Sequence, residues 1–167
     1  MNPSLSEEIE SLLNQQMAAE ARASANYLAM ASWCDRCGYR YAAKFLYKHA
    51  EEERSHMMKI FHYINDMGGQ AIHPAIEQPK TIFSSFRNVF ELVFSHEVDV
   101  TKQIHNLVDR CLATKDFATF NFMQWFVQEQ IEEENLARRA LELFGVVEGD
   151  GVGHHMIDNA LNNLELN

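Results

Sequence analysis

The stretch His49-Ala-Glu-Glu-Glu-Arg-Ser-His56 places two polar side chains where a helix of this pattern should be apolar. At a spacing of three or four residues, Glu53 and His56 continue a stripe otherwise built mainly from core residues, namely Ala42, Phe45, His49, Ile60, Ile64 and Met67. An ionised carboxylate buried without a partner is strongly destabilising or takes up a proton. A carboxylate and an imidazole one turn apart on a core stripe therefore indicate a cation held between helices.

The composition favours one acidic domain that handles cations. The chain has 167 residues and a formal net charge of −10, so we expect a single domain spanning 1–167. The acidic balance argues against nucleic-acid binding by electrostatic attraction. No apolar run approaches the roughly 20 residues of a membrane span, and residues 1–10 lack the segments of a signal peptide. We therefore expect a cytoplasmic protein that does not interact with membranes.

Hydrophobic periodicity predicts an all-α protein, because no convincing strand pattern occurs. Ser4 and Glu7 have the spacing of a capping box before the first helix, and Asp116 is a candidate cap for the fourth. Residues 70–84 contain two prolines and no periodicity, which is typical of a long connection. The expected helices span about 5–36, 39–67, 85–113, 116–144 and 152–164.

The lengths of the connections predict the topology. Very short turns join the first helix to the second and the third to the fourth, so each pair should form an antiparallel hairpin. The connection between the second and third helices, about 15 residues, can extend over roughly 50 Å. That reach covers the length of a bundle of about 40 Å. The sequence therefore predicts a four-helix bundle with a long crossover and a short fifth helix at the carboxyl end.

Polar residues interrupt the apolar stripes of all four long helices at matching heights. At about 1.5 Å per residue, Glu20 and Glu53 both lie about 21 Å from the first turn. By the same measure Glu97 and Glu133 both lie about 25 Å from the second turn. Each hairpin thus brings its polar side chains to the middle of the bundle, where His56 and Gln130 lie on the same stripes.

Four inward carboxylates and one imidazole at one level repel one another unless cations share them. Two divalent ions balance four carboxylates. Oxygen-rich ligation with one histidine suits iron or manganese, although zinc can occupy similar ligands. Carboxylates that bridge can hold two metals a few ångströms apart. A dinuclear metal site is therefore favoured over a buried polar layer that shares protons.

Four stretches of the sequence match a known family. They are Ala18-Ala19-Glu20 with Tyr27, the stretch 49–56, His96-Glu97, and Asn121-Phe-Met-Gln-Trp-Phe-Val-Gln-Glu-Gln-Ile-Glu-Glu-Glu134. Through them the whole chain resembles the bacterial non-haem ferritins. The resemblance implies a ferritin-like bundle, a homo-oligomeric shell of 24 subunits, and oxidation of Fe(II) to Fe(III) by oxygen or peroxide with storage of ferric mineral.

The resemblance also implies a set of iron ligands. Glu20, Glu53 and His56 would bind the first iron, and Glu53 would bridge to a second iron held by Glu97 and Glu133. Gln130 would lie beside that second iron. Bacterioferritins usually carry a second Glu-x-x-His motif, whereas the fourth helix here has Gln130-x-x-Glu133. A haem group is not expected.

Further acidic and aromatic residues match secondary features of that family. Glu52, Glu129 and Glu132 match a third iron site, although such charge runs are normally solvated helix faces. Tyr27 matches a tyrosine that supplies an electron, and Trp125 is a neighbour on the same path. The alternative for both rings is simple packing.

Other motifs and functions carry less weight. Cys34-x-x-Cys37 looks like a redox motif but closes a helix, whereas thioredoxin-like chemistry needs it at a helix start. His49 is interpreted as a hydrogen-bonded core histidine, and His154-His155 as a solvated helix start. The main alternative function is a di-iron oxidoreductase, bacterioferritin-like or peroxidase-like, that keeps its metals. A passive cage and a DNA-protecting mini-ferritin are both disfavoured, because this chain supplies a complete ligand set itself.

Overall fold

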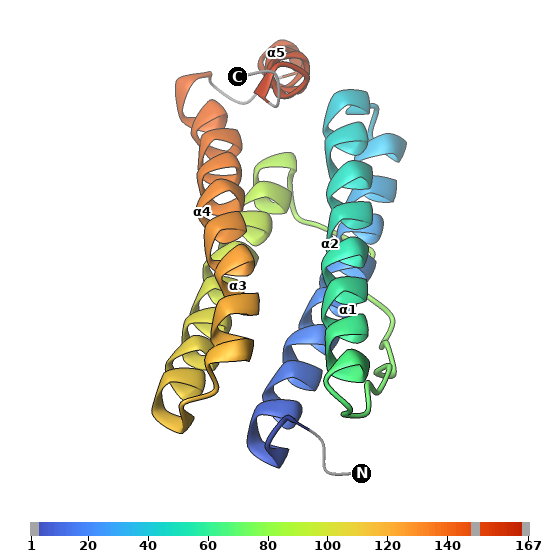
Figure 1. Ribbon diagram of the computed structural model, residues 1–167. Coiled ribbons are helices and arrows are strands. Elements are labelled where there is room, and N and C mark those ends of the chain that lie inside the picture. Colours follow the sequence, from blue (N-terminus) through green and yellow to red (C-terminus); the bar gives the residue numbers. More distant parts are fainter. Residues whose placement is uncertain (1–3, 148–150, 165–167) are drawn as a thin grey trace.

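The computed structural model describes residues 4–147 and 151–164, and within them it contains five α-helices and no strand. The two hairpins α1–α2 and α3–α4 pack side by side as a four-helix bundle (Figure 1). This architecture confirms the predicted fold class. The helices are α1 (Glu7–Arg36), α2 (Arg40–Asp66), α3 (Phe86–Thr114), α4 (Phe117–Val146) and α5 (Gly151–Leu161).

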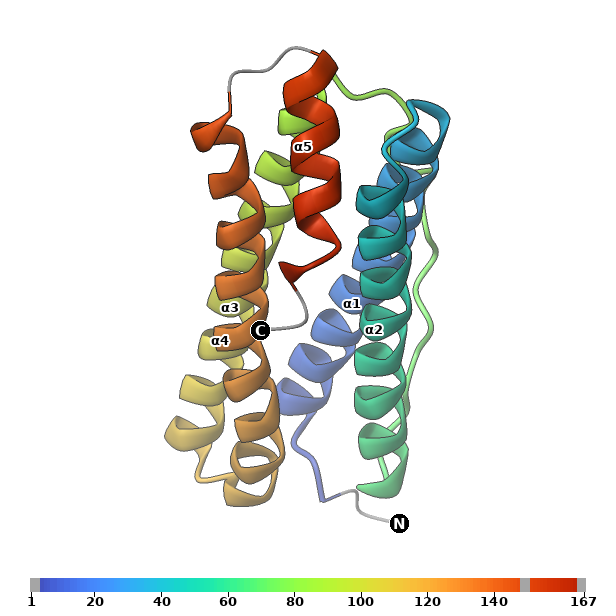
Figure 2. The same cartoon turned by 90° about the horizontal axis from the view of Figure 1, so that it is seen from above.

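The connection between α2 and α3 contains no regular structure and runs back along the length of the bundle (Figures 1 and 2). It returns the chain to the end of the bundle from which α2 started, so α3 runs parallel to α2. The predicted crossover is therefore present. Among the described residues, no helix is both long enough and apolar enough to cross a lipid bilayer.

Local capping sets where the helices begin. The side chain of Ser6 accepts a hydrogen bond from the Ile9 amide at 3.2 Å, and that of Asp116 accepts one from the Thr119 amide at 2.9 Å. The Asp116 cap was predicted correctly. The capping box at Ser4 was wrong, because Ser6 directly precedes the first helical residue. The Ser4 amide instead donates to the Met67 carbonyl at 3.1 Å.

The short turns use backbone conformations with positive φ. Gly38 ends the α1–α2 turn at φ 86°, and Gly68 follows α2 at φ 81°. Lys115 joins α3 to α4 at φ 61°, a left-handed conformation that is uncommon for a residue with a side chain. The shortness of these turns forces each hairpin to be antiparallel.

The apolar core is split into two clusters by a polar layer. One cluster surrounds Phe86 and Phe90 near the α1–α2 turn, and the other surrounds Leu13 and Ile104 near the α3–α4 turn. Buried polar side chains lie at or beside the boundary between the two clusters on each long helix, and they are Gln16, Glu20, His49, Glu53, His56, Glu97, Gln130 and Glu133. Packing on both sides of this layer fixes its height in the bundle.

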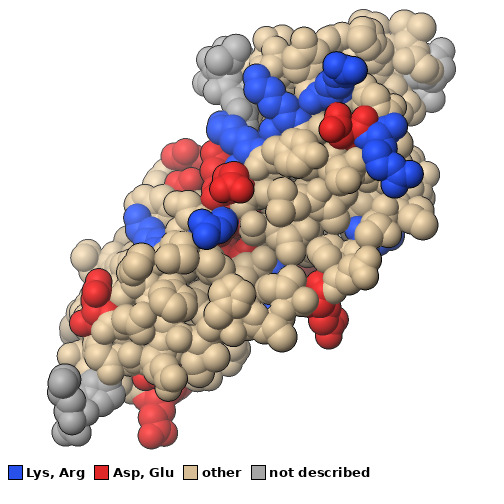
Figure 3. Space-filling view, turned by 90° about the vertical axis from the view of Figure 1, so that its right-hand side faces the viewer, with Lys and Arg blue, Asp and Glu red and all other residues tan. Residues whose placement is uncertain are grey.

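Helix α5 lies across one end of the bundle and contacts α2 and α4 (Figure 2). Ile157, Leu161 and Leu164 join the apolar cluster at this end. The predicted fifth helix extended to residue 164, whereas the helix ends at Leu161 and a turn follows. On the face formed by α1, α2 and the connection, both signs of charge occur, and basic side chains gather toward the upper end (Figure 3).

Candidate metal centre

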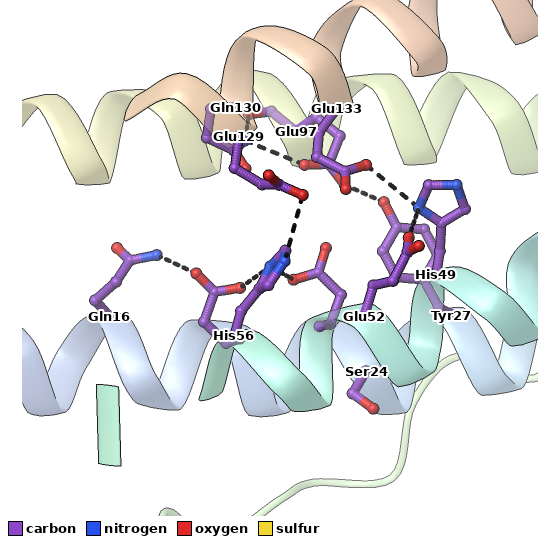
Figure 4. Close-up of polar contacts among 12 residues, drawn as sticks. Gln16, Ser24, Tyr27, His49, Glu52, His56, Glu97, Glu129, Gln130 and Glu133 are labelled. Carbon is purple, nitrogen blue, oxygen red and sulfur yellow. Dashed lines mark hydrogen bonds and ion pairs between the residues drawn. The ribbon is translucent and has the colours of Figure 1, made fainter. Parts of the chain in front are cut away.

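Side chains from all four long helices meet in the polar layer. Those from the α3–α4 hairpin point toward those from the α1–α2 hairpin (Figure 4). The carboxylates are deeply buried: Glu20 is 1% exposed, Glu53 3% and Glu97 1%. Groups of this kind need either protons or cations to remain in a protein interior.

One group of potential ligands comprises Glu20, Glu53 and His56. Each offers one ligand atom, and these three atoms all lie within 4.8 Å of one another. The Nδ1 atom of His56 lies 3.4 Å from Oε2 of Glu53 and 3.7 Å from Oε2 of Glu20. Two carboxylates and an imidazole at this spacing can converge on one divalent ion.

Two further groups border the first. Glu53 also lies with Glu97 and His96 in a set of ligand atoms within 4.8 Å of one another. His56 lies in another such set with Glu133 and Glu129. Glu53 therefore stands between the group on α1 and α2 and the carboxylate on α3, which is where a bridging carboxylate would have to lie. The five residues expected to bind two irons are thus all in one layer.

Two amide side chains orient the carboxylates. The Nε2 atom of Gln130 donates to Glu97 at both the backbone oxygen and Oε2, each at 3.2 Å, and to Oγ1 of Thr101 at 3.3 Å. Gln16 donates from Nε2 to Oε1 of Glu20 at 2.8 Å. Sequence reasoning assigned no role to Gln16. Its position one turn before Glu20 on the same stripe was the available signal.

Tyr27 contacts the layer from the side of α1. Its hydroxyl donates a hydrogen bond to Oε1 of Glu97. Burial, together with the negative charge of Glu97 and Glu53, raises the pKa of Tyr27 well above its ordinary value. The phenol is therefore protonated at neutral pH and available as a hydrogen-bond donor to a ligand carboxylate.

The pKa shifts describe how the layer balances its own charge. Burial and the charge of Glu20 raise the pKa of Glu53 well above its usual range. Burial and the charge of Glu133 raise the pKa of Glu97 from 4.5 to about 7. Burial also opposes ionisation of Glu20, but hydrogen bonds from His56 and Glu53 outweigh it and lower the pKa. Protons thus occupy a site whose carboxylates would otherwise repel one another, and divalent cations would displace them.

Comparison with known proteins decides the family. A family model described as a ferritin-like domain matches residues 10–145. The chain belongs to the ferritin family. It is 43% identical over 160 residues to a probable bacterial non-heme ferritin-like protein of Haemophilus influenzae, covering 96% of this chain and 97% of that protein. It is 38% identical over 162 residues to the bacterial non-heme ferritin of Campylobacter jejuni, covering 97% of each.

Solved structures agree with this family. A novel open-pore ferritin from the hyperthermophilic archaeon Archaeoglobus fulgidus superposes with a TM-score of 0.91 at 38% identity. The superposition covers 95% of this chain and 97% of that one. The predicted resemblance to bacterial non-haem ferritins is therefore confirmed over nearly the whole chain.

The acidic residues predicted to hold a third iron are only partly brought together in this ferritin. The Oε1 atom of Glu129 lies 3.8 Å from Nε2 of His56, and Oε2 of Glu52 lies 3.4 Å from Nδ1 of His49. Glu132 belongs to none of the ligand groups found among residues 4–147 and 151–164. It lines an open groove between α3 and α4 instead. A third iron site at these residues stays a prediction.

His49 is buried beside the layer, as expected for a core histidine. Its Nδ1 atom lies 3.3 Å from Oε2 of Glu133, and its ring packs against Phe45 with centroids 4.3 Å apart. Burial opposes protonation, but hydrogen bonding to Glu133 and the charges of Glu133 and Glu52 raise the pKa of His49 overall. His49, Glu52 and Glu133 also form a group of potential ligands.

His96 received no role from the sequence beyond its place in the family motif. Its ring meets that of Tyr27 edge to face with centroids 5.8 Å apart. The Nε2 atom of His96 is buried and has no hydrogen-bond partner among the described residues. An unsatisfied buried polar atom costs about 1–3 kcal/mol, so this histidine needs an explanation.

Trp125 lies beside the layer and is partly exposed. Its ring meets that of His56 edge to face with centroids 5.3 Å apart, and the Nζ atom of Lys59 lies 3.8 Å from the centre of its ring. This contact between Trp125 and a candidate ligand is compatible with the predicted electron path and does not test it.

The cysteines of this ferritin do not form a reactive pair. Cys34 is buried in the apolar cluster near the α1–α2 turn, whereas Cys37 is exposed at the end of α1. Burial raises the pKa of the Cys34 thiol far above its ordinary value, which removes its nucleophilic form. The Cys34-x-x-Cys37 motif thus lies at the end of α1, as the sequence predicted.

Proposed function

We propose that this ferritin oxidises Fe(II) to Fe(III) at the polar layer and stores the product as ferric mineral. The observation that carries the proposal is the convergence of Glu20, Glu53, His56, Glu97 and Glu133 from four helices on one buried layer. Two Fe(II) ions are the substrate, and their four positive charges balance the four carboxylates.

The chain's own residues account for binding and release. Glu20 and His56 bind one Fe(II), Glu97 and Glu133 bind the other, and Glu53 bridges them. Binding displaces the protons held by Glu53 and Glu97, because a divalent ion stabilises the carboxylate form. Hard oxygen ligands favour the ferric state, while the sparse ligation of the second ion leaves it free to move on toward the mineral.

Three further assignments belong to the same proposal. Tyr27 holds the orientation of Glu97 and supplies an electron when oxidation needs one beyond those of iron. Trp125, whose ring contacts His56, is a further residue on the electron path. Glu52, Glu129 and Glu132 form the exit side of the site, where a third iron binds. Identical subunits assemble into a 24-subunit shell in the cytoplasm and enclose the mineral.

A rapid-mixing experiment tests the proposal. The protein is loaded anaerobically with two Fe(II) per subunit, mixed with oxygenated buffer and followed by visible absorbance, then loaded again with many Fe(II) per subunit. A transient band at two irons, followed by growth of soluble ferric mineral at high loading, is the expected result. Oxidation that ends after the first two irons would refute storage.

Oxidation that ends after two irons per subunit would instead support a retained di-iron cofactor. The observation in favour of this alternative is the pair of imidazoles, His49 and His96, beside the carboxylates of the second ion. Additional nitrogen ligands would hold the metal more firmly than carboxylates alone. Iron that stays bound through gel filtration at a fixed ratio of two per subunit would decide for it.

A further inference from the structure

A cleft of about 260 Å³ opens between α1 and α3, next to the polar layer. Its polar lining comes from both helices, with Asn26 on α1 and Ser95, His96 and Asp99 on α3. Tyr27 also lines it. The five proposed iron ligands lie outside this lining, and His96 is the one lining residue named above as an additional ligand in the alternative of a retained cofactor. The cleft therefore adjoins the iron site without containing it.

The inner wall of the cleft is also the outer wall of the iron site. Tyr27 donates its hydroxyl to Glu97, which is proposed to bind the second iron. His96 places a ring nitrogen within 4.8 Å of carboxylate oxygens of both Glu53 and Glu97. Because the two rings meet edge to face, they separate the cleft from the bridging carboxylate, and a small molecule would reach that carboxylate when the His96 ring turns aside.

The lining of the cleft suits a small neutral molecule better than a cation. Asn26, Ser95 and His96 offer an amide, a hydroxyl and an imidazole, which together donate and accept hydrogen bonds. The single carboxylate, Asp99, is largely exposed, and its Oδ1 already accepts from Nζ of Lys102 at 3.3 Å. Its charge is therefore offset, and the cleft has little to attract Fe(II).

The other two helices border the layer with the opposite chemistry. Glu52 on α2 and Glu129 on α4 are both partly exposed beside His49 and His56 (Figure 4). Carboxylates in partial contact with solvent draw in divalent cations. The two sides of the layer thus differ in charge, and a neutral reactant and a cationic one would each have a separate approach.

We propose that the cleft between α1 and α3 binds hydrogen peroxide and admits it to the iron site. Peroxide carries two O–H donors and several lone pairs, so it can pair with the amide and hydroxyl of the cleft and, as the His96 ring turns toward the cleft, with the buried and unpartnered Nε2 of that ring. Dioxygen lacks donors and gains nothing from such a lining. This inference rests on the proposed oxidation of Fe(II) in the layer.

The reaction that peroxide would enter balances without another reagent. Two Fe(II) ions each give one electron, the O–O bond of one peroxide molecule breaks, and two protons from solvent complete two water molecules. The products are two Fe(III) and two H₂O. Peroxide is consumed in full, and the cleft residues are recovered unchanged.

Filling the cleft from either wall tests the proposal. Ser95→Phe and Asn26→Phe each add a ring to an exposed cleft residue that is not an iron ligand. The protein is loaded anaerobically with two Fe(II) per subunit and mixed rapidly with hydrogen peroxide or with oxygen. We expect both variants to lower the second-order rate with peroxide about tenfold or more, while the rate with oxygen changes about twofold or less.

A matched control separates the cleft from general damage. Ser55→Phe makes the same change at an exposed residue that precedes His56 as Ser95 precedes His96, yet Ser55 lies outside the cleft. It should leave both rates unchanged. Anaerobic Co(II) titration, followed by its visible bands, should give the same stoichiometry for all variants as for the unmodified protein.

Three results would overturn the proposal. The first is an unchanged peroxide rate in both cleft variants. The second is an equal slowing with oxygen and peroxide. The third is slower Co(II) binding in the cleft variants than in Ser55→Phe, which would make the cleft a cation entrance. If the unmodified protein neither binds Co(II) nor oxidises Fe(II), the proposed function itself fails, and that outcome is separate from these three.

Discussion

The hydroxyl of Tyr27 donates to Oε1 of Glu97 across 70 residues of sequence, joining the first hairpin of the bundle to the second. Both side chains are almost fully buried. The bond links an oxidisable ring to a carboxylate proposed to bind iron, so it connects the electron path to the metal site. It also satisfies an oxygen that would otherwise be a buried acceptor without a partner.

Tyr27→Phe separates these two roles. The variant keeps the ring in the core and removes only the hydroxyl, so we expect folding with a loss of about 1–3 kcal/mol in the free energy of unfolding. Co(II) should still bind at two sites per subunit. Radical signals detected by electron paramagnetic resonance after Fe(II) is mixed with oxygen should lose the tyrosyl component. A tyrosyl signal of unchanged intensity would exclude Tyr27 as the electron donor.

Glu53→Ala should disable both proposed iron sites at once, because Glu53 belongs to the ligand groups of Glu20 and of Glu97. We expect Co(II) affinity and the initial rate of Fe(II) oxidation to fall about 100-fold or more, since even indirect partners of a metal ligand are worth 10–100-fold. Glu51→Ala is the matched control, because Glu51 is an exposed glutamate on the same helix. Equal oxidation rates in the two variants would indicate passive storage.

The sequence predicted the bundle and most of the layer because both depend on local rules. Helical periodicity shows which face of each helix is buried, and a carboxylate on that face is conspicuous because burying it is costly. Very short turns fix the pairing of helices, so equal spacing from a turn places Glu20 opposite Glu53. The coincidence of four such positions needs no knowledge of side-chain contacts.

What the sequence could not give depends on contacts between distant segments. His96 lies one residue before a ligand and off the buried stripe, and only the packing of α1 against α3 places it between a cleft and the iron site. The cap at Ser6 rather than Ser4 depends on where α1 actually starts. The direction in which α5 runs also depends on packing, because the sequence between the end of α4 and the start of α5 does not determine it.

The protonated layer predicts an unusual dependence of stability on pH in the metal-free protein. The pKa of Glu97 rises from the ordinary glutamate value of 4.5, which applies to the unfolded chain, to about 7 in the folded chain. The folded state therefore binds more protons than the unfolded state between these values, so stability falls as pH rises through this range. Glu97 alone accounts for a loss of up to roughly 3 kcal/mol. The raised pKa of Glu53 acts in the same direction.

Denaturant titrations of the metal-free protein at pH 5, 6, 7 and 8 check this prediction. Glu97→Gln should reduce the loss of stability between pH 5 and pH 8, because the glutamine amide does not titrate. The depressed pKa of Glu20 contributes with the opposite sign, but its stabilisation is lost only as pH falls below the ordinary range of a carboxyl group. Bound Co(II) should stabilise the protein more at pH 8 than at pH 5. Stability that climbs steadily from pH 5 to 8 without metal would contradict the charge balance described for the layer.

Asp158 provides the attachment of α5, and its removal should release that helix without disturbing the iron site. Helix α2 begins at Arg40, and its N-cap residue Tyr39 makes no side-chain capping hydrogen bond. Buried Asp158 takes that place from 116 residues away: its Oδ1 accepts from the Ala42 amide at 2.8 Å, and its Oδ2 accepts from the Tyr41 amide at 3.3 Å. A carboxylate at a helix start also meets the positive end of the helix dipole.

Asp158→Ala should therefore cost about 1–2 kcal/mol, as expected for a lost N-cap. Amide hydrogen exchange should become faster in α5 and in the first turn of α2, while exchange in the middle of α3 and Co(II) binding stay the same. Asn159→Ala, at the exposed neighbouring residue, should leave exchange in the first turn of α2 unaltered. If exchange in α5 is equally slow in both variants, apolar packing of Ile157 and Leu161 alone holds the helix, and the cap supplied by Asp158 only stabilises α2.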